Sequence, residues 1–260
     1  MTPFFLVDPA AMNVASILLG FAMLQNTKGL TPAINVCTNK SCRKNGAAQT
    51  LTIIEDLAGP SAVAVYKCGC LGSCNSGPNV RCETEAGVDK MYLGVTTPAT
   101  AAAVLAIEFD IDVPDEVVEA YSLHSQGQSG TDKERIRCNT AALNSKKLDG
   151  YHSAKATFLI GRAEALVASR RSMGLRACRS AGLDALQAAR LVPSQPRVWW
   201  TLRDAMVAGK RPRAGLTALK ALCASTEDPV AIKAACADAC KLCEEVSNDH
   251  PFCHDLDGEN

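Results

Sequence analysis

The chain has 260 residues and carries 27 acidic and 27 basic side chains, so its formal net charge is zero. Apolar residues make up 47% of it and aromatic residues only 5%, which favours a soluble, helix-rich protein over an all-β one. Its 13 cysteines cluster early and late in the chain. This odd count fits metal ligation in a reducing compartment better than the dense, even-numbered disulfide framework of a small secreted domain.

Residues 1–30 contain an apolar stretch from Ala10 to Leu24. The stretch is shorter than the roughly twenty residues that a membrane-spanning helix needs. No Lys or Arg precedes it, so the pattern of a signal peptide is incomplete. We therefore interpret the segment as a targeting remnant or as a helix that packs against a partner, with a membrane anchor as the less favoured alternative.

Residues 31–112 alternate strand and helix patterns. Short apolar, β-rich runs predict strands, and leucine and isoleucine at helical spacing in AAQTLTIIEDLAG predict a helix that Gly59 ends. The predicted order is a strand (about 33–38), a helix (47–59), a strand (61–66), two hairpin strands joined at Gly87, and a helix that begins near Pro98.

Two cysteine pairs lie in the loops at the ends of these strands. Cys37 and Cys42 form a C-x4-C spacing in VCTNKSCRKNGA, and Cys70 and Cys74 form a C-x3-C spacing in CGCLGSCNSGPNV. One pair alone fits a disulfide, a metal site or coincidence. Loops at strand ends let the backbone wrap a cluster, and zinc is the weaker alternative because four-cysteine zinc sites usually use short C-x2-C knuckles.

With these motifs and the flanking CRKNGA, residues 31–112 resemble the thioredoxin-like [2Fe-2S] ferredoxins of cyanobacteria and plastids. That family is related to the small iron–sulfur subunit of NADH dehydrogenases. Plant-type ferredoxins are excluded, because their spacing places a cysteine where Asn45 stands. Cys68 and Cys82 depart from the pattern: Cys68 is expected to be a buried strand thiol, or else an alternative ligand. The resemblance implies an α+β thioredoxin-like domain with one [2Fe-2S] cluster, whose ligands are Cys37, Cys42, Cys70 and Cys74.

Thiolate charge at such a cluster has to be offset by backbone N–H groups and nearby cations. The expected sources are Lys40, Arg43, Lys44, Gly72 and Gly77.

Residues 113–131 are expected to form a short helix that runs into a polar linker, with the weakest joint near 125–131. An all-α domain follows over residues 132–246. A 34-residue period fits windows 162–195 and 196–229, and this part resembles tetratricopeptide repeats, with an unclassified helical bundle as the alternative. The predicted breaks are Gly150, Gly174, Pro193 to Pro196, Lys210 to Pro212, and Pro229, and residues 230–246 would form a capping helix.

The last cysteines are Cys236, Cys240 and Cys243, a C-x3-C-x2-C spacing that radical-SAM enzymes use for a [4Fe-4S] cluster. On a helix these positions share one face, so packing in the core is the favoured interpretation. Residues 247–260 are expected to be an acidic tail. Its His250, Cys253 and His254 are a weaker alternative, as a site for adventitious metal.

The zero net charge conceals two oppositely charged regions. Residues 131–223 carry 18 basic and 6 acidic side chains, a net of +12, and residues 224–260 carry 2 and 9, a net of −7. The expected partner is an acidic protein surface or a large multisubunit complex, contacted by Arg197, Arg203 and Arg211. Nucleic acid is disfavoured because stacking aromatic residues are scarce there, and any membrane association is expected to be indirect.

No HExxH, phosphate-loop or nucleophile-elbow motif is present, which argues against an autonomous hydrolase or kinase. The favoured function is electron transfer or redox sensing by one [2Fe-2S] cluster. Helical repeats would dock the protein to a photosynthetic or respiratory complex, where it exchanges electrons with donor and acceptor proteins. The alternative is a scaffold or assembly subunit with a structural or vestigial cluster site. The family resemblance favours the plastid (stroma or thylakoid-associated), with the mitochondrion as the other candidate.

Overall fold

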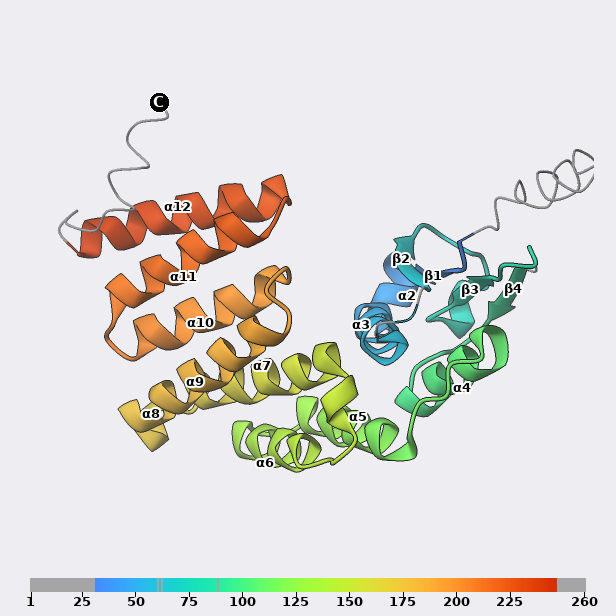
Figure 1. The fold of residues 1–260 in the computed structure, drawn as a ribbon, viewed down its shortest axis with the longest axis horizontal. Helices are drawn as coiled ribbons and strands as arrows, with labels where there is room; N and C mark the ends of the chain where they lie inside the picture. The colour runs from blue at the N-terminus through green and yellow to red at the C-terminus, as the bar shows by residue number, and fades with distance from the viewer. Residues whose placement is uncertain (1–30, 60, 62, 88, 247–260) are drawn as a thin grey trace, which may run out of the picture.

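The structure is a computed structural model that describes residues 31–59, 61, 63–87 and 89–246 (Figure 1). The expectations for residues 1–30 and for the tail at 247–260 lie outside these residues. A small sheet with its covering helices occupies one end of the molecule, and a stack of helices extends from it to the other end.

The sheet has four strands in the order β2-β1-β3-β4. β1 pairs in parallel with β2 and antiparallel with β3, and β3 pairs antiparallel with β4. The strand and helix order expected for residues 31–112 is observed, with a one-turn helix, α2, and a 3-10 turn, η1, added. The elements are β1 (Ala33–Cys37), α2 (Lys40–Lys44), α3 (Ala47–Ala58), β2 (Ala64–Cys68), η1 (Cys74–Ser76), β3 (Val80–Glu83), β4 (Asp89–Tyr92) and α4 (Pro98–Phe109).

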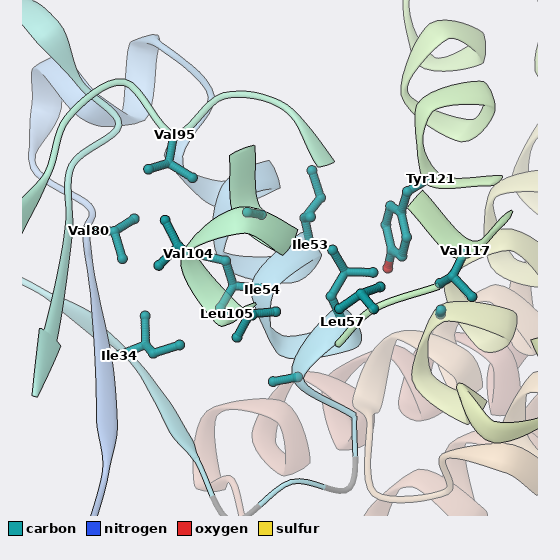
Figure 2. Close-up of a cluster of buried hydrophobic side chains, with 14 of the residues drawn as sticks. Ile34, Ile53, Ile54, Leu57, Val80, Val95, Val104, Leu105, Val117 and Tyr121 are labelled. Carbon is teal, nitrogen blue, oxygen red and sulfur yellow. The ribbon is translucent and has the colours of Figure 1, made fainter. Parts of the chain in front are cut away.

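One face of the sheet is packed against α3 and α4. Ile34 of β1 lies opposite Cys82 of β3, and Val36 lies opposite Val80, and all four side chains are buried. Cross-strand pairs of this kind are the unit that stabilises a sheet. Ile54, Val104 and Leu105 of α3 and α4 lie on the side of the strands, and Ile53 and Leu57 of α3 extend the same cluster toward Tyr121 and Val117 (Figure 2).

The core of the sheet continues into the helical half. Residues 113–131 are expected to form a short helix that runs into a polar linker, and the helix α5 (Asp115–Gln128) extends into the part expected to be linker. Val117 and Tyr121 of α5 are buried beside Leu57 of α3 (Figure 2). Phe158, further along the chain, belongs to the same cluster. The helix extends further than expected because the apolar side chains of α5 pack against α3. These contacts are distant in sequence, so the local residue pattern does not reveal them.

The remaining helices follow one another as packed neighbours, and α7 also contacts α10. Each predicted break falls at a helix boundary, and Pro196, Pro212 and Pro229 each occupy the first turn of a helix, where a missing N–H costs nothing. The helices are α6 (Asp132–Leu143), α7 (His152–Ala168), α8 (Arg170–Met173), α9 (Leu175–Leu191), α10 (Pro196–Ala208), α11 (Pro212–Ser225) and α12 (Pro229–Glu245), and a 3-10 turn, η2 (Leu148–Gly150), precedes α7.

The window 196–229 contains the helix pair α10 and α11, whereas the window 162–195 begins inside α7. The chain therefore combines a small mixed sheet with a helical array, and assignment of that array to tetratricopeptide repeats stays a prediction. Within the described residues, no helix combines the length and the hydropathy needed to cross a membrane.

Candidate metal centre

Cys37 is the last residue of β1, at the edge where the two parallel strands end. In the β1–β2 register, Cys37 lies beside Cys68, and the next residue, Thr38, donates hydrogen bonds of 3.0 Å to the Cys68 carbonyl from both its backbone nitrogen and its hydroxyl. The carboxyl ends of the two strands are thereby held together. Cys37 is fully buried and Cys68 is half-buried, so the two thiols begin a cysteine-rich edge of the sheet.

Cys42 reaches the same edge from α2. Asn39 caps this helix by accepting a hydrogen bond from the Lys40 backbone nitrogen, which fixes the turn between Cys37 and Cys42. The Cys42 side chain is fully buried and clusters with Cys37 and Ala47. Cys42, which was expected in a loop, therefore lies in a short helix that turns its thiol back toward the end of β1.

The loop between β2 and β3 carries the second pair and lies against α2. A Cβ placed at Gly77 would collide with the Cys42 sulfur, so only glycine permits this approach. The Asn45 side-chain amide donates a hydrogen bond of 3.4 Å to the Gly77 carbonyl, and η1, which begins at Cys74, contacts α2. The loop with Cys70 and Cys74 is thus brought to the helix with Cys42.

Asn79 holds the shape of this loop. Its side-chain amide donates hydrogen bonds to the carbonyls of Gly72 (2.8 Å) and Ser73 (3.1 Å), and its own carbonyl accepts one from the Cys37 backbone nitrogen (2.9 Å). Asn79 is fully buried, and its Oδ1 has no hydrogen-bond partner among the described residues. Sequence reasoning missed Asn79, because its partners are backbone carbonyls that no residue pattern reveals.

Cys70 is exposed, whereas the predicted ligands Cys37 and Cys42 are buried. The Gly72 backbone N–H donates to its sulfur at 3.4 Å, which is possible because Gly72 adopts φ +84°, a conformation that favours glycine. The Gly72 N–H therefore points at the sulfur of a predicted ligand, and that Cys70 binds a cluster stays a prediction. For Cys74 the structure describes the backbone only, as the first residue of η1.

The two remaining thiols of this domain differ in their surroundings. Burial is the main cause that raises the pKa of Cys68, and the neighbouring Cys37 adds to it, although Cys68 is only half-buried. Cys82 is fully buried on the core side of β3, and burial raises its pKa to about 12. A protonated, enclosed thiol is a packing residue, so Cys82 is excluded from the candidate site.

The helix α2 carries three basic side chains. The Arg43 guanidinium donates to the carbonyl of Thr38, next to Cys37, with its Nη2 at 3.2 Å. Lys40, Arg43 and Lys44 line a shallow hollow together with Asn39. These cations suit an anionic centre at the end of β1, as the sequence indicates.

The described residues fit the donor chemistry of a [2Fe-2S] cluster in part. Three predicted ligands, Cys37, Cys42 and Cys70, supply thiols from segments held together at one sheet edge, and Gly77 leaves the room that the Cys42 sulfur occupies. Soft thiolates are the ligands that iron–sulfur clusters require. Within the part of the chain that the structure describes, no three or more His, Cys, Asp or Glu side chains already form a metal-binding group.

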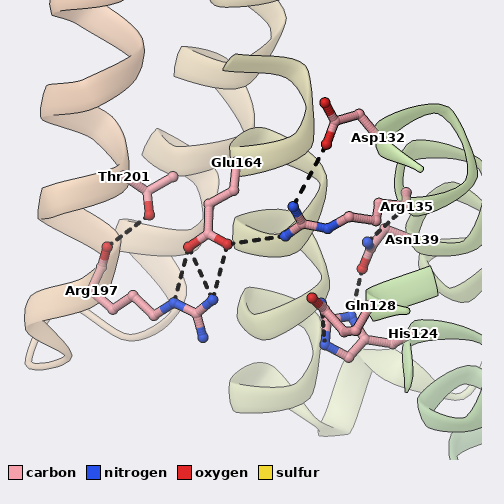
Figure 3. Close-up of polar contacts among 8 residues, drawn as sticks. All are labelled: His124, Gln128, Asp132, Arg135, Asn139, Glu164, Arg197 and Thr201. Carbon is pink, nitrogen blue, oxygen red and sulfur yellow. Dashed lines mark hydrogen bonds and ion pairs between the residues drawn. The ribbon is translucent and has the colours of Figure 1, made fainter. Parts of the chain in front are cut away.

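Two of the three arginines predicted to contact a partner are paired within the chain. Arg197 of α10 binds Glu164 of α7 through two nitrogens, at 2.9 to 3.1 Å (Figure 3). Arg203 pairs with Asp204 at 2.6 Å and also with Asp238 of α12. Arg211 is exposed and has no carboxylate partner among the described residues. The structure therefore leaves Arg211 as the predicted contact that is most available to a partner.

The C-terminal cysteines do not share a buried face. α12 packs on α11 through Ala235, Ala239 and Leu242, whereas Cys240 is exposed and Cys236 is half-buried. The expectation of core packing is wrong for these two cysteines and right for Cys243, which is buried. Cys243 is also disulfide-bonded, which the preference for free thiols did not anticipate.

His124 of α5 lies in a polar network between helices. Its Nδ1 donates to Asn139 Oδ1 at 2.6 Å, and Gln128 donates to its Nε2 at 3.1 Å (Figure 3). Burial lowers its pKa, so the ring stays neutral. Gly161 of α7 faces this pair, and a Cβ there would lie 3.0 Å from both His124 and Asn139. These hydrogen bonds join α5 and α6, and the absence of a side chain at Gly161 lets α7 pack against them.

Comparison with known proteins finds one curated protein that is similar to part of this chain. Diacylglycerol O-acyltransferase 3-2 of Glycine max is 29% identical over 98 residues, which is 37% of this chain and 29% of that protein. The chain thus matches under a third of the length of this relative. No protein-family model matches the chain, and no solved structure matches it.

Proposed function

We propose that this chain is an iron–sulfur redox protein, in which a thioredoxin-like domain holds one [2Fe-2S] cluster on Cys37, Cys42, Cys70 and Cys74. The observation that carries the proposal is the convergence at one sheet edge. Cys37 ends β1, Cys42 turns back to it from α2, and Gly77 brings the loop with the second pair against the Cys42 sulfur. When bound, such a cluster accepts and returns one electron.

The residues around the centre would each have a defined task. Asn79 fixes the loop through Gly72 and Ser73, and the N–H of Gly72 already points at the Cys70 sulfur. Arg43 and the lysines of α2 offset negative charge. Burial of Cys37 and Cys42 excludes water on the inner side, and exposure of Cys70 leaves the outer side open to an electron partner.

The helical half would dock this centre to a larger assembly. Its helices share a core with the sheet domain, so a partner bound to the helices would hold the cysteine edge in a fixed orientation. An acyl transfer like that in the relative's name is not proposed, because the match covers only 29% of that protein.

Anaerobic purification of the full chain, followed by iron and acid-labile sulfide analysis and EPR of the reduced protein, tests the proposal. Two irons and two sulfides per chain are expected from the stoichiometry of such a cluster. A colourless protein with neither iron nor sulfide after anaerobic reconstitution would instead favour the scaffold function.

A further inference from the structure

A groove with an apolar floor lies between α9 and the end of α10, far from the cysteine edge. Its volume is about 470 Å³. Leu175, Leu183 and Leu186 of α9 line it and are 53%, 63% and 36% exposed. Single exposed leucines are ordinary, but several on one helix face that line one hollow indicate an interaction site.

Small residues where α9 meets α10 create the hollow. Gly182 of α9 lies so close to α10 that a Cβ there would be 2.9 Å from the terminal carbon of Met206. Cys178, Ala205 and Gly209 also line the hollow, and their small side chains leave it open beside Met206. Because the two helices approach closely, the three leucines of α9 lie exposed along one side of the hollow.

Three arginines lie along this groove: Arg176, Arg179 and Arg211. All three are exposed, and none has a carboxylate partner among the described residues.

Three other arginines of the helical half are paired with carboxylates within the chain. Arg162 binds Asp184 at 2.7 Å, and Arg197 and Arg203 also have acidic partners. Within the part of the chain that the structure describes, the positive charge of the groove is therefore not offset by a carboxylate, unlike that of these three arginines.

We propose that this groove docks an acidic amphipathic helix of a partner protein, with apolar side chains against the three leucines and carboxylates against the three arginines. From Leu175 to Leu186 the groove follows about 16 Å of α9, room for three helical turns of a ligand. The lining residues include no aromatic ring on which a nucleic-acid base would stack. A concave floor also suits a helix better than a flat bilayer.

This inference rests on the docking half of the proposed function and is independent of the cluster. Iron and sulfide analysis of the same sample therefore separates a failure of docking from a failure of the metal centre.

The test uses the full chain and a fluorescent synthetic peptide of about 18 residues, five helical turns, with leucine at i, i+4 and i+7 and glutamate elsewhere. Binding is followed by fluorescence anisotropy at about 0.15 M salt. A triple variant, Arg176→Gln with Arg179→Gln and Arg211→Gln, should weaken binding about 30-fold, since each exposed ion pair contributes about threefold. Leu183→Asp should weaken it at least tenfold, because it places a carboxylate in the apolar contact.

Two matched variants serve as controls. Arg190→Gln removes an exposed arginine of α9 that does not line the groove, and Ile107→Asp places a charge at an exposed apolar site on α4. Both should bind the peptide like the parent, and a peptide with lysine in place of glutamate should not bind.

Three results would overturn the proposal. The first is equal loss of binding in the control and groove variants. The second is tighter binding to phosphatidylserine vesicles, lost in the same groove variants, which would assign the groove to a membrane surface. The third is peptide binding that appears only after residues 247–260 are deleted, which would make the chain's own acidic tail the occupant. Unchanged binding after that deletion supports a separate partner.

Discussion

Thr157 of α7 donates a hydrogen bond of 2.6 Å to Oδ2 of Asp56, which lies on α3, 101 positions earlier in the chain. The Tyr121 hydroxyl of α5 donates to the same oxygen. Asp56 is only 1% exposed, so one buried carboxyl group joins helices of the sheet domain and of the helical half. Burial raises its pKa from 3.8 to about 6, against the opposing effect of these hydrogen bonds.

Stability should therefore fall as the pH rises from about 4 to about 6. In this window the folded state keeps the Asp56 proton while the unfolded state has lost it, so protonation favours folding at the acidic end only. A folded-state pKa that lies roughly two above the unfolded-state pKa corresponds to about 3 kcal/mol. Glu55 and Arg197 also interact electrostatically with this carboxyl, so the pH dependence of the parent has to be compared with that of a variant.

Asp56→Asn is that variant, because an amide oxygen still accepts from Tyr121 and Thr157 without carrying charge. It should be up to about 3 kcal/mol more stable than the parent at pH 7 and equal to it near pH 4. Urea unfolding at several pH values measures the difference. Parallel pH profiles for the two proteins would contradict the assignment of the transition to Asp56.

The sheet domain should not be stable when cut at residue 112. The sequence indicates a weak joint at 125–131, but the core that covers the sheet extends through α5 to α7. A fragment of residues 31–112 loses buried side chains that a fragment of residues 31–170 keeps: Val113, Val117, Ala120, Tyr121, Ala142, Leu148, Ala154 and Phe158.

The short fragment should therefore show no cooperative thermal transition, whereas the long one should unfold cooperatively. Phe158→Ala in the full chain should cost about 3 to 5 kcal/mol, as for other buried aromatic residues. Circular dichroism melts compare all three proteins. Equal melting temperatures for the two fragments would show that the sheet domain is independent.

Features that depend on neighbouring residues in the chain could be predicted from the sequence, and features that depend on distant residues could not. Prolines at 196, 212 and 229 end or start helices through their own backbone, so the helix breaks could be predicted from the sequence. Whether Cys240 faces the core depends on which side of α12 packs against α11. The helical spacing of the cysteines alone does not determine that side. Tyr121 was missed for the same reason, because its partner Asp56 lies 65 positions away.

In the candidate metal centre, too, only the features that depend on local sequence could be predicted. Cysteine spacing and the strand pattern place Cys37 at the end of a strand, and the structure agrees. The roles of Asn79 and Thr38 depend on backbone carbonyls from other loops, which only a folded chain brings within reach.

Single replacement of Cys37, Cys42, Cys70 or Cys74 by serine should abolish or bleach the iron–sulfur absorbance, since a hard alkoxide replaces a soft thiolate. The matched control is Cys240→Ser, an exposed cysteine on α12. Cys68→Ser is the sharpest comparison, because Cys68 lies beside Cys37 in the strand register. Loss of colour in Cys68→Ser with retention in Cys70→Ser would show that Cys68, and not Cys70, is the cluster ligand.

Gly77 provides a test of the site that leaves every cysteine in place. A Cβ at this position would collide with the Cys42 sulfur, so in Gly77→Ala either the loop or α2 has to move. Overpacking of this kind costs about 1 to 3 kcal/mol, and here it would separate the two segments that carry the predicted ligand pairs. Gly69→Ala is the matched control, because a Cβ at Gly69 meets nothing within 4 Å. We expect Gly77→Ala to lose most of its iron after anaerobic reconstitution while Gly69→Ala retains the parental content. Parental iron content and an unchanged EPR spectrum in Gly77→Ala would mean that the contact between Gly77 and Cys42 does not shape a metal centre.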